Sequence, residues 1–271
     1  MTTTVSAPTP LSARVYRGHA VGDAITMAWR NLLNIRRNPQ LLVFATVQPV
    51  IFVVMFRYVF GGAIQGSLPA GQSYINYLMP GVFVQTIVFG ALTTAVGLAD
   101  DLSKGLIDRF RSLPMARSAV LVGRTLADLV RNFFVLILVC TVGFIVGWTI
   151  ETNVWGLVGA FGIILAFAYS LSWLFAIVGL SVKDGETAQA VSFPILAVLV
   201  FASSAFVPVA TMPSWLQPWA RNQPVSVVID AARVLTIGGP TREYVIKSIL
   251  WIVAIVAVCA PIAVARYRKV T

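Results

Sequence analysis

The stretch LMPGVFVQTIVFGALTTAVGLA, residues Leu78–Ala99, contains no charged side chain and is long enough to cross a bilayer as one helix. A helix rises about 1.5 Å per residue, so the roughly 30 Å hydrocarbon core requires about 20 apolar residues. The run does not alternate apolar and polar residues as the strands of a membrane barrel do. We therefore predict a helical membrane protein.

Further apolar runs of similar length occur along the chain, so that six transmembrane helices are expected. The composition agrees, because 58% of the residues are hydrophobic and only 11% are charged, whereas an average soluble domain is about 25% charged. The predicted fold class is an all-α polytopic membrane protein. Its expected spans are Leu41–Phe60, Leu78–Ala99, Asn132–Ile150, Trp155–Ser181, Ala190–Val209 and Ser248–Ala265.

The positions of lysine and arginine predict the orientation of these spans. The net charge is +10, and most of the 20 basic residues fall on one side of the membrane if the N-terminus is inside. Cytoplasmic loops carry such an excess, so both termini are expected in the cytoplasm, and the plasma membrane is the expected location. No basic surface interleaved with aromatic residues remains outside the spans, so nucleic-acid binding is not expected.

The segments around the spans complete the expected organisation. Residues 1–20 are rich in Thr, Ser, Ala and Pro and are expected to be a disordered cytoplasmic tail, followed by a single transmembrane domain over 21–271. Gly22–Arg37 has helical apolar spacing and is expected to lie in the cytoplasmic interface. Pro208–Gly239 is broken by prolines and is expected to form two short helices at the outer surface, with a plain loop as the alternative.

Several kinds of active site are excluded by what the sequence lacks. No Asp, Glu or His falls in the middle of an expected span, so a proton relay is not expected. No GxxxxGK[ST] phosphate loop occurs, so the chain is not expected to bind ATP in that manner. Cys140 and Cys259 lie inside apolar runs, and His19 stands alone, so neither a disulfide nor a metal site is expected. Any uphill transport must therefore be powered by a partner.

The stretch GLIDRFRSLPMARSAVLVGR, Gly105–Arg124, is arginine-rich and broken by a proline between two apolar runs. Asp101–Arg111 can form a short cytoplasmic helix along the membrane, and Ser112-Leu113-Pro114 then turns the chain. Such a helix, held between two spans, is suited to receiving mechanical force. The alternative is a solvated loop whose arginines serve only as topology signals.

Two ordered sets of motifs carry a resemblance to a known family. The first is Asp108–Pro114, read as DRFRSLP and followed by Arg117 and Gly123-Arg124. The second is Met212–Leu216, read as MPSWL and followed by Asn222-Gln223-Pro224 and Ala231-Ala232-Arg233. The chain resembles the membrane (permease) subunits of type-2 ABC exporters, in particular the daunorubicin-resistance permease group. Many members of that group place a glutamate where this chain has the shorter Asp108.

The resemblance implies a transporter made of two copies of this chain, a homodimer, and two copies of a separate ATPase. The ATP and magnesium would be bound by the ATPase, and this chain would hold no cofactor and have no enzyme activity. A cytoplasmic coupling helix at about residues 100–117 would carry the movement of the ATPase into the spans. The residues expected to take part are Asp101, Lys104, Asp108, Arg109, Arg111, Pro114 and Arg117.

The cargo implied by the resemblance is a hydrophobic or amphipathic small molecule, as in multidrug efflux and antibiotic resistance. Export of a lipid-linked polysaccharide or a lipid is the alternative within the family, and a stand-alone channel or membrane enzyme is the alternative outside it. Gln85 and Phe89 lie one helical turn apart, and Phe201 and Ser204 are also expected on one face. These four residues are the predicted cargo path, with helix packing as the competing interpretation.

Overall fold

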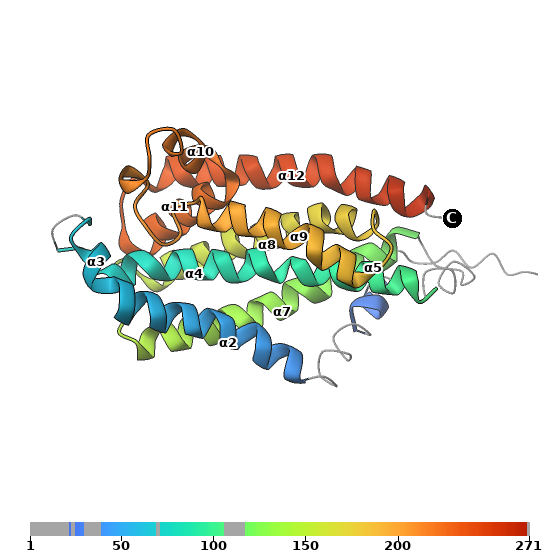
Figure 1. Ribbon diagram of the computed structural model, residues 1–271, viewed down its shortest axis with the longest axis horizontal. Coiled ribbons are helices and arrows are strands. Elements are labelled where there is room, and N and C mark those ends of the chain that lie inside the picture. Colours follow the sequence, from blue (N-terminus) through green and yellow to red (C-terminus); the bar gives the residue numbers. More distant parts are fainter. Residues whose placement is uncertain (1–21, 23–24, 30–38, 69–70, 106–116, 270–271) are drawn as a thin grey trace, which may run out of the picture.

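The computed structural model describes residues 22, 25–29, 39–68, 71–105 and 117–269, and over these ranges its regular structure is helical, with no β-strand (Figure 1). The predicted all-α class is thus confirmed for the described residues. Five helical segments are long and apolar enough to cross a membrane. They are Thr46–Gln65, Tyr74–Ser103, Leu121–Ile145, Val154–Gly179 and Thr241–Tyr267.

The elements run up and down along the long axis of the molecule (Figure 1). A helical bundle forms because the apolar helices pack against helices that are distant in the sequence as well as against their chain neighbours; α8, for example, contacts α5, α7, α11 and α12. In chain order the elements are α2 (Pro39–Met55), the π-helical turn η1 (Phe56–Phe60), α3 (Gly61–Gln65), α4 (Tyr74–Gly90), α5 (Leu92–Ser103), α7 (Arg117–Ile145), α8 (Val154–Gly179), α9 (Gly185–Phe201), the 3₁₀ turn η2 (Val209–Thr211), α10 (Gln217–Asn222), α11 (Pro224–Ile237) and α12 (Thr241–Lys269).

The two ends of the bundle differ in content. Helices α3, α10 and α11 gather at one end, which we call the α11 end (Figure 1). At the opposite end α5 finishes, α7 begins and α12 approaches the C-terminus (Figure 1). Because Lys104, Arg117 and Arg266 belong to these segments, we call it the basic end.

The helix pair α4–α5 is the centre of the bundle. In the most apolar part of Tyr74–Ser103, 67% of the residues are buried, against 17% for Thr46–Gln65 and for Thr241–Tyr267. All of α4 from Tyr74 to Val88 is buried. A helix that is apolar on every side must be surrounded by protein or lipid, and here the surrounding groups are largely those of the chain itself. A polar residue on α4 therefore faces protein.

The fifth expected span is placed differently from the prediction. The prediction was Ala190–Val209, but α9 runs from Gly185 to Phe201. The helix begins earlier because the Asp184 side chain accepts a hydrogen bond from the Thr187 backbone N–H at 2.7 Å, and this contact lowers the pKa of the Asp184 carboxyl. Its 17 residues reach only about 26 Å at ~1.5 Å per residue. After Phe201 the chain leaves the helix and turns.

Helix boundaries on either side of the segment 104–116 are also displaced. The second span was expected over Leu78–Ala99, but its helix pair runs through Ser103. The third was expected over Asn132–Ile150, but α7 already begins at Arg117 and ends at Ile145. Gly147 adopts a φ of 98°, which favours glycine and turns the chain after the helix end. The predicted coupling segment is thus bounded by the α4–α5 pair and by α7.

Pro208–Gly239 contains the two short helices that the sequence predicted. Both α10 and α11 carry a proline in the first turn, where the missing N–H costs no hydrogen bond. Helix α11 is largely buried and packs against α4, α8 and α12. It therefore closes the α11 end of the bundle rather than lying on its surface.

Only part of the expected N-terminal helix lies within the described residues. Gly22 and residues 25–29 are helical, and Met27 is buried in a cluster with Leu98 and Tyr267. Ile25 and Trp29, which were expected on its apolar face, are exposed. Residues 1–21 and 30–38, including the predicted tail, lie outside the described residues.

Candidate functional site

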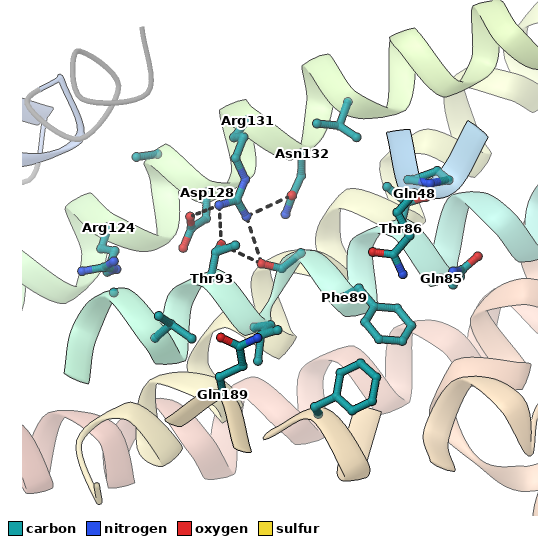
Figure 2. A pocket seen from close by; sticks show the side chains of 18 of the residues that line it. Gln48, Gln85, Thr86, Phe89, Thr93, Arg124, Asp128, Arg131, Asn132 and Gln189 are labelled. Carbon is teal, nitrogen blue, oxygen red and sulfur yellow. Dashed lines mark hydrogen bonds and ion pairs between the residues drawn. The ribbon is translucent and has the colours of Figure 1, made fainter. Parts of the chain in front are cut away.

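A groove of about 670 Å³ lies between α2, α4, α5, α7 and α9 (Figure 2). Binding sites for small molecules commonly enclose about 300–1,000 Å³. Its walls come from helices that are far apart in the sequence, and it runs alongside the central α4–α5 pair. A space of this size and position is suited to an organic ligand.

One part of the groove is apolar and aromatic. The rings of Phe89 on α4 and Phe193 on α9 face each other with centroids 6.0 Å apart and planes inclined by 52°. Pro49, Val96 and Val135 extend this wall. Tilted aromatic pairs at this separation offer ring faces and edges to a further aromatic group.

A second part of the wall is an ion pair on α7. Asp128 Oδ1 lies 3.2 Å from Arg131 Nη1, and the side chains are only 10% and 11% exposed. Thr94 donates a hydrogen bond from Oγ1 to Asp128 Oδ2 at 2.6 Å. Arg131 also donates to the Gly90 carbonyl at 3.0 Å and to Thr93 (Figure 2). The pair therefore ties α7 to the junction of α4 and α5.

A third part lies nearer the basic end. Arg124 Nη1 donates to Asp101 Oδ2 at 2.6 Å, which joins α7 to the last turns of α5. The guanidinium can lie there because Gly97 has no side chain; a Cβ at Gly97 would stand 1.7 Å from Arg124 Nη2. Asp100 accepts a hydrogen bond from the Gly185 backbone N–H at 3.1 Å and lies 3.7 Å from Lys104. The α5–α7 junction is thus held by paired charges.

The predicted coupling residues are only partly covered by the described residues. Asp101 belongs to α5 and, like Lys104 just beyond it, has an ion-pair partner within this chain. Arg117 is the first residue of α7. The remaining predictions fall in the segment 106–116, outside the described residues. They are Asp108, Arg109, Arg111 and Pro114.

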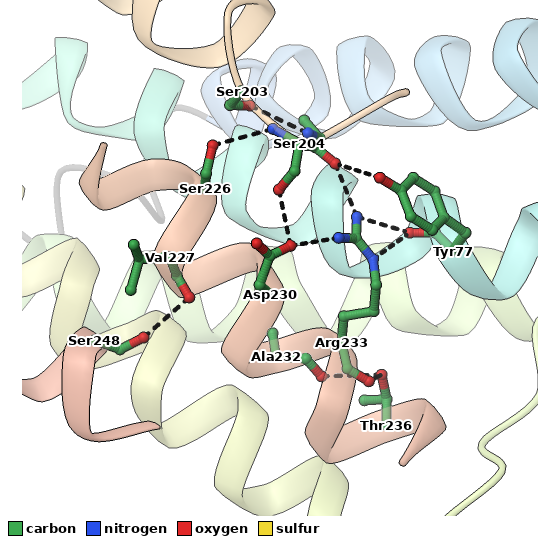
Figure 3. Close-up of polar contacts among 11 residues, drawn as sticks. Tyr77, Ser203, Ser204, Ser226, Val227, Asp230, Ala232, Arg233, Thr236 and Ser248 are labelled. Carbon is green, nitrogen blue, oxygen red and sulfur yellow. Dashed lines mark hydrogen bonds and ion pairs between the residues drawn. The ribbon is translucent and has the colours of Figure 1, made fainter. Parts of the chain in front are cut away.

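The four residues of the predicted cargo path do not lie together. Gln85 and Phe89 both line the groove. Phe201 instead packs against Phe206, with ring centroids 5.7 Å apart, and Ser204 lies in a polar network at the α11 end (Figure 3). The prediction placed Phe201 and Ser204 on one helical face, but α9 ends at Phe201 and Ser204 lies beyond it.

The polar network at the α11 end is centred on Arg233. Its Nη1 donates to Asp230 Oδ1 at 2.6 Å, its Nη2 donates to the Ser204 carbonyl at 2.8 Å, and its guanidinium carbon stands 3.7 Å from the centre of the Tyr77 ring (Figure 3). Ser204 Oγ donates to Asp230 Oδ1 at 2.9 Å. The network joins α4, α11 and the turn after α9.

A close backbone approach accompanies this network. A Cβ on Gly81 of α4 would stand 2.1 Å from the Ala205 carbonyl oxygen, so only glycine allows the turn to lie so near the helix. Burial raises the pKa of the Asp230 carboxyl, and the guanidinium of Arg233 and the Ser204 hydroxyl oppose that rise. The polar groups between α4 and α11 are thus paired with one another by hydrogen bonds and fill the space between the two helices.

The Asp128–Arg131 and Asp230–Arg233 ion pairs were not predicted from the sequence, although both show the same local pattern. In Asp128-Leu129-Val130-Arg131 and Asp230-Ala231-Ala232-Arg233 an aspartate precedes an arginine by three residues on a helix. This spacing brings the two charges together on one helix face. Arg131 was interpreted as a topology signal and Arg233 also as part of a family motif, and the pairing was not considered.

The described residues contain no group of three or more His, Cys, Asp or Glu placed to hold a metal ion. Cys140 and Cys259 are free and buried. The bundle of apolar helices, with an amphipathic groove between them, defines a multi-pass membrane protein. The groove has room for a small organic molecule and is lined by aromatic and polar side chains that could contact it.

Comparison with known proteins identifies the family. The ABC-2 type transporter family matches residues 23–237, and this chain belongs to it. A daunorubicin resistance ABC transporter permease protein of Streptomyces coeruleorubidus is 33% identical over 98% of this chain and 96% of its own length. A probable doxorubicin resistance ABC transporter permease protein of Mycobacterium tuberculosis is 27% identical over 85% and 83% of the two chains. The family resemblance seen in the sequence is confirmed, and the chain is a membrane permease subunit of an ABC transporter.

Proposed function

We propose that this permease exports hydrophobic or amphipathic small molecules across the plasma membrane, powered by a separate ATPase. The observation that carries the proposal is the groove of about 670 Å³ between the helices of a chain whose relatives are named as drug resistance permeases. Its aromatic pair Phe89 and Phe193 suits an apolar ring, and its polar wall suits hydroxyl and carbonyl groups.

Energy would enter at the segment between α5 and α7. The sequence has no phosphate loop of its own, so ATP and magnesium would be bound by the partner, in an assembly of two permeases and two ATPases. Asp101 and Arg124 join the two helices that border the segment. Since this ion pair connects α5 and α7, a push on the predicted coupling helix, about residues 100–117, would move both helices together.

The topology that we propose has six spans, with α9 as the short fifth span and both termini in the cytoplasm. Segments that carry Lys104, Arg117 and Arg266 lie at one end of the bundle (Figure 1), as the excess of positive charge on cytoplasmic loops would require. The segment 61–77 at the opposite end has no charged residue.

Ser67 offers a test of this topology, because it is exposed in the turn after α3. In a Ser67→Cys variant, a membrane-impermeant maleimide added to intact cells is expected to label the new cysteine. The parent chain, whose two cysteines are buried, serves as the control. Labelling that occurs only after lysis would place the segment inside and overturn the proposed orientation.

The function itself is tested by ATP-driven transport in inside-out vesicles. The permease, reconstituted with its partner ATPase, is expected to take up doxorubicin with ATP, and vanadate is expected to abolish that uptake. Vesicles without the ATPase serve as the control. Uptake of a lipid-linked oligosaccharide but not of doxorubicin would replace the proposed cargo class. No coupling to ATP at all would reject an ABC exporter.

A further inference from the structure

Gln85 is a buried amide with an unused acceptor in the wall of the groove. The residue is 1% exposed, it lines the groove, and its Oε1 has no hydrogen-bond partner among the described residues. Buried polar atoms are nearly always paired, and an unpaired one is costly. A ligand that brings an O–H or N–H to this oxygen would remove that cost.

Arg124 supplies an unused donor at the other end of the row of labelled side chains (Figure 2). Its Nη1 is taken by Asp101, but its Nε is buried and has no partner in the described part of the chain. Because the positive charge is already paired, this N–H is suited to a neutral carbonyl oxygen. The groove therefore offers an acceptor and a donor on separate walls.

An aromatic surface belongs to the same groove. Phe89 is labelled between Gln85 and Arg124 in the view of Figure 2, and its ring pairs with Phe193 at 6.0 Å. Phe193 is 51% exposed, so its ring is accessible to a ligand. A flat ring system can therefore pack against this pair.

The charged side chains in the groove wall determine whether a charged or an uncharged ligand group can bind there. Asp128 is paired with Arg131, Arg124 with Asp101, and Asp100 with the Gly185 N–H and Lys104. A phosphate or carboxylate entering the groove would have to displace one of these acidic partners, and transfer of an unpaired charge from water is costly. The wall therefore favours an uncharged ligand group.

We propose that the groove is a cargo-binding site contained within one permease copy, with Gln85 as its hydrogen-bond acceptor. It takes the flat, uncharged part of an amphipathic molecule, with a hydroxyl or amide N–H at Gln85 Oε1, a ring beside Phe89 and Phe193, and a carbonyl oxygen at Arg124 Nε. The inference rests on the proposed export function and adds to it the place and the polar contacts of recognition.

The test compares two fluorescent ligands on the permease–ATPase complex in nanodiscs. Doxorubicin has flat rings with hydroxyl donors, whereas Nile red has flat rings and a carbonyl but no O–H or N–H. Gln85→Leu is expected to raise the Kd of doxorubicin about 3- to 10-fold, the loss typical of one neutral hydrogen bond. The Kd of Nile red is expected to stay within about twofold, because Nile red cannot donate to Gln85.

Three companion variants separate recognition from a structural effect. Gln85→Glu keeps an oxygen acceptor and should retain doxorubicin binding, while Phe193→Ala should weaken both ligands. Gln217→Leu makes the same change at a half-buried glutamine on α10, outside the groove, and should alter neither Kd. Equal weakening of both ligands by Gln85→Leu, or weakening of neither, would overturn the inference.

The same experiment distinguishes failure of the site from failure of the proposed function. A wild-type complex that exports doxorubicin in vesicles, with groove variants that bind it normally, would leave the export function standing and reject this site. A wild-type complex that neither exports nor binds doxorubicin or Nile red would reject both.

Discussion

Replacing Arg233 with methionine is expected to destabilise the folded permease by about 3–5 kcal/mol, which is typical when one partner of a buried ion pair is removed. The change leaves Asp230, whose side chain is only 26% exposed, with Ser204 as its remaining hydrogen-bond donor, and it removes the arginine donors to the Ser204 and Tyr77 carbonyls. Tryptophan fluorescence during titration with sodium dodecyl sulfate would measure the free energy of unfolding.

The pH dependence of this loss of stability gives a second check of the Arg233 prediction. Without Arg233, the pKa of the Asp230 carboxyl, already raised by burial, should rise further. A buried acid with a raised pKa in the folded state destabilises the fold above its unfolded pKa, and the cost disappears as the pH falls. The variant should therefore recover part of its stability on acidification.

Two control variants make the Arg233 prediction specific. Arg221→Met removes an exposed arginine whose side chain contacts Gln217 and should change the stability by at most about 0.5 kcal/mol. The double variant Asp230→Leu/Arg233→Met removes both charges and should cost less than the sum of the single changes. Additive losses in the double variant would show that the two side chains do not act as a pair.

Hydropathy predicts the long apolar helices of this fold, although several of their bounds are displaced. A run such as Leu78–Ala99 has no stable alternative to a membrane helix, and it forms the core of α4–α5. The end of α9 was not predictable in this way. The apolar pattern continues past Phe201 to Val209, and the helix stops where Gly81 and Arg233, distant in sequence, hold the following turn.

Only part of the candidate site was predicted from the sequence. Gln85 was identified because a polar side chain in a span must face protein or water, and it lies in the wall of the groove. Asp128 and Arg131 were not identified, because they precede the apolar run that was taken as the third span. The contacts that bury them come from Thr94 and Gly90 of a different helix pair, which local sequence does not reveal.

Breaking the Asp128–Arg131 ion pair in the groove wall is the second change with a large expected effect. Asp128→Asn is expected to destabilise the permease by about 3 kcal/mol, the lower end for a broken buried pair, because Arg131 still donates to the Gly90 carbonyl. The groove would also gain one positive charge. At an effective dielectric constant of 20, a cationic cargo group about 8 Å away would be repelled by about 2 kcal/mol. Uptake of doxorubicin, whose amino group is protonated at neutral pH, should then fall at least about tenfold at subsaturating concentration.

The charge explanation is distinguished from simple misfolding by two further variants. Asp184→Asn makes the same substitution at the exposed start of α9; asparagine caps a helix as well as aspartate, so stability and uptake should hardly change. In Asp128→Asn/Arg131→Gln the groove is neutral again, so doxorubicin uptake should recover relative to Asp128→Asn even if stability does not. An uptake that stays equally low in the double variant would mean that the carboxylate matters through its shape or its bond to Thr94, and not through the charge it balances.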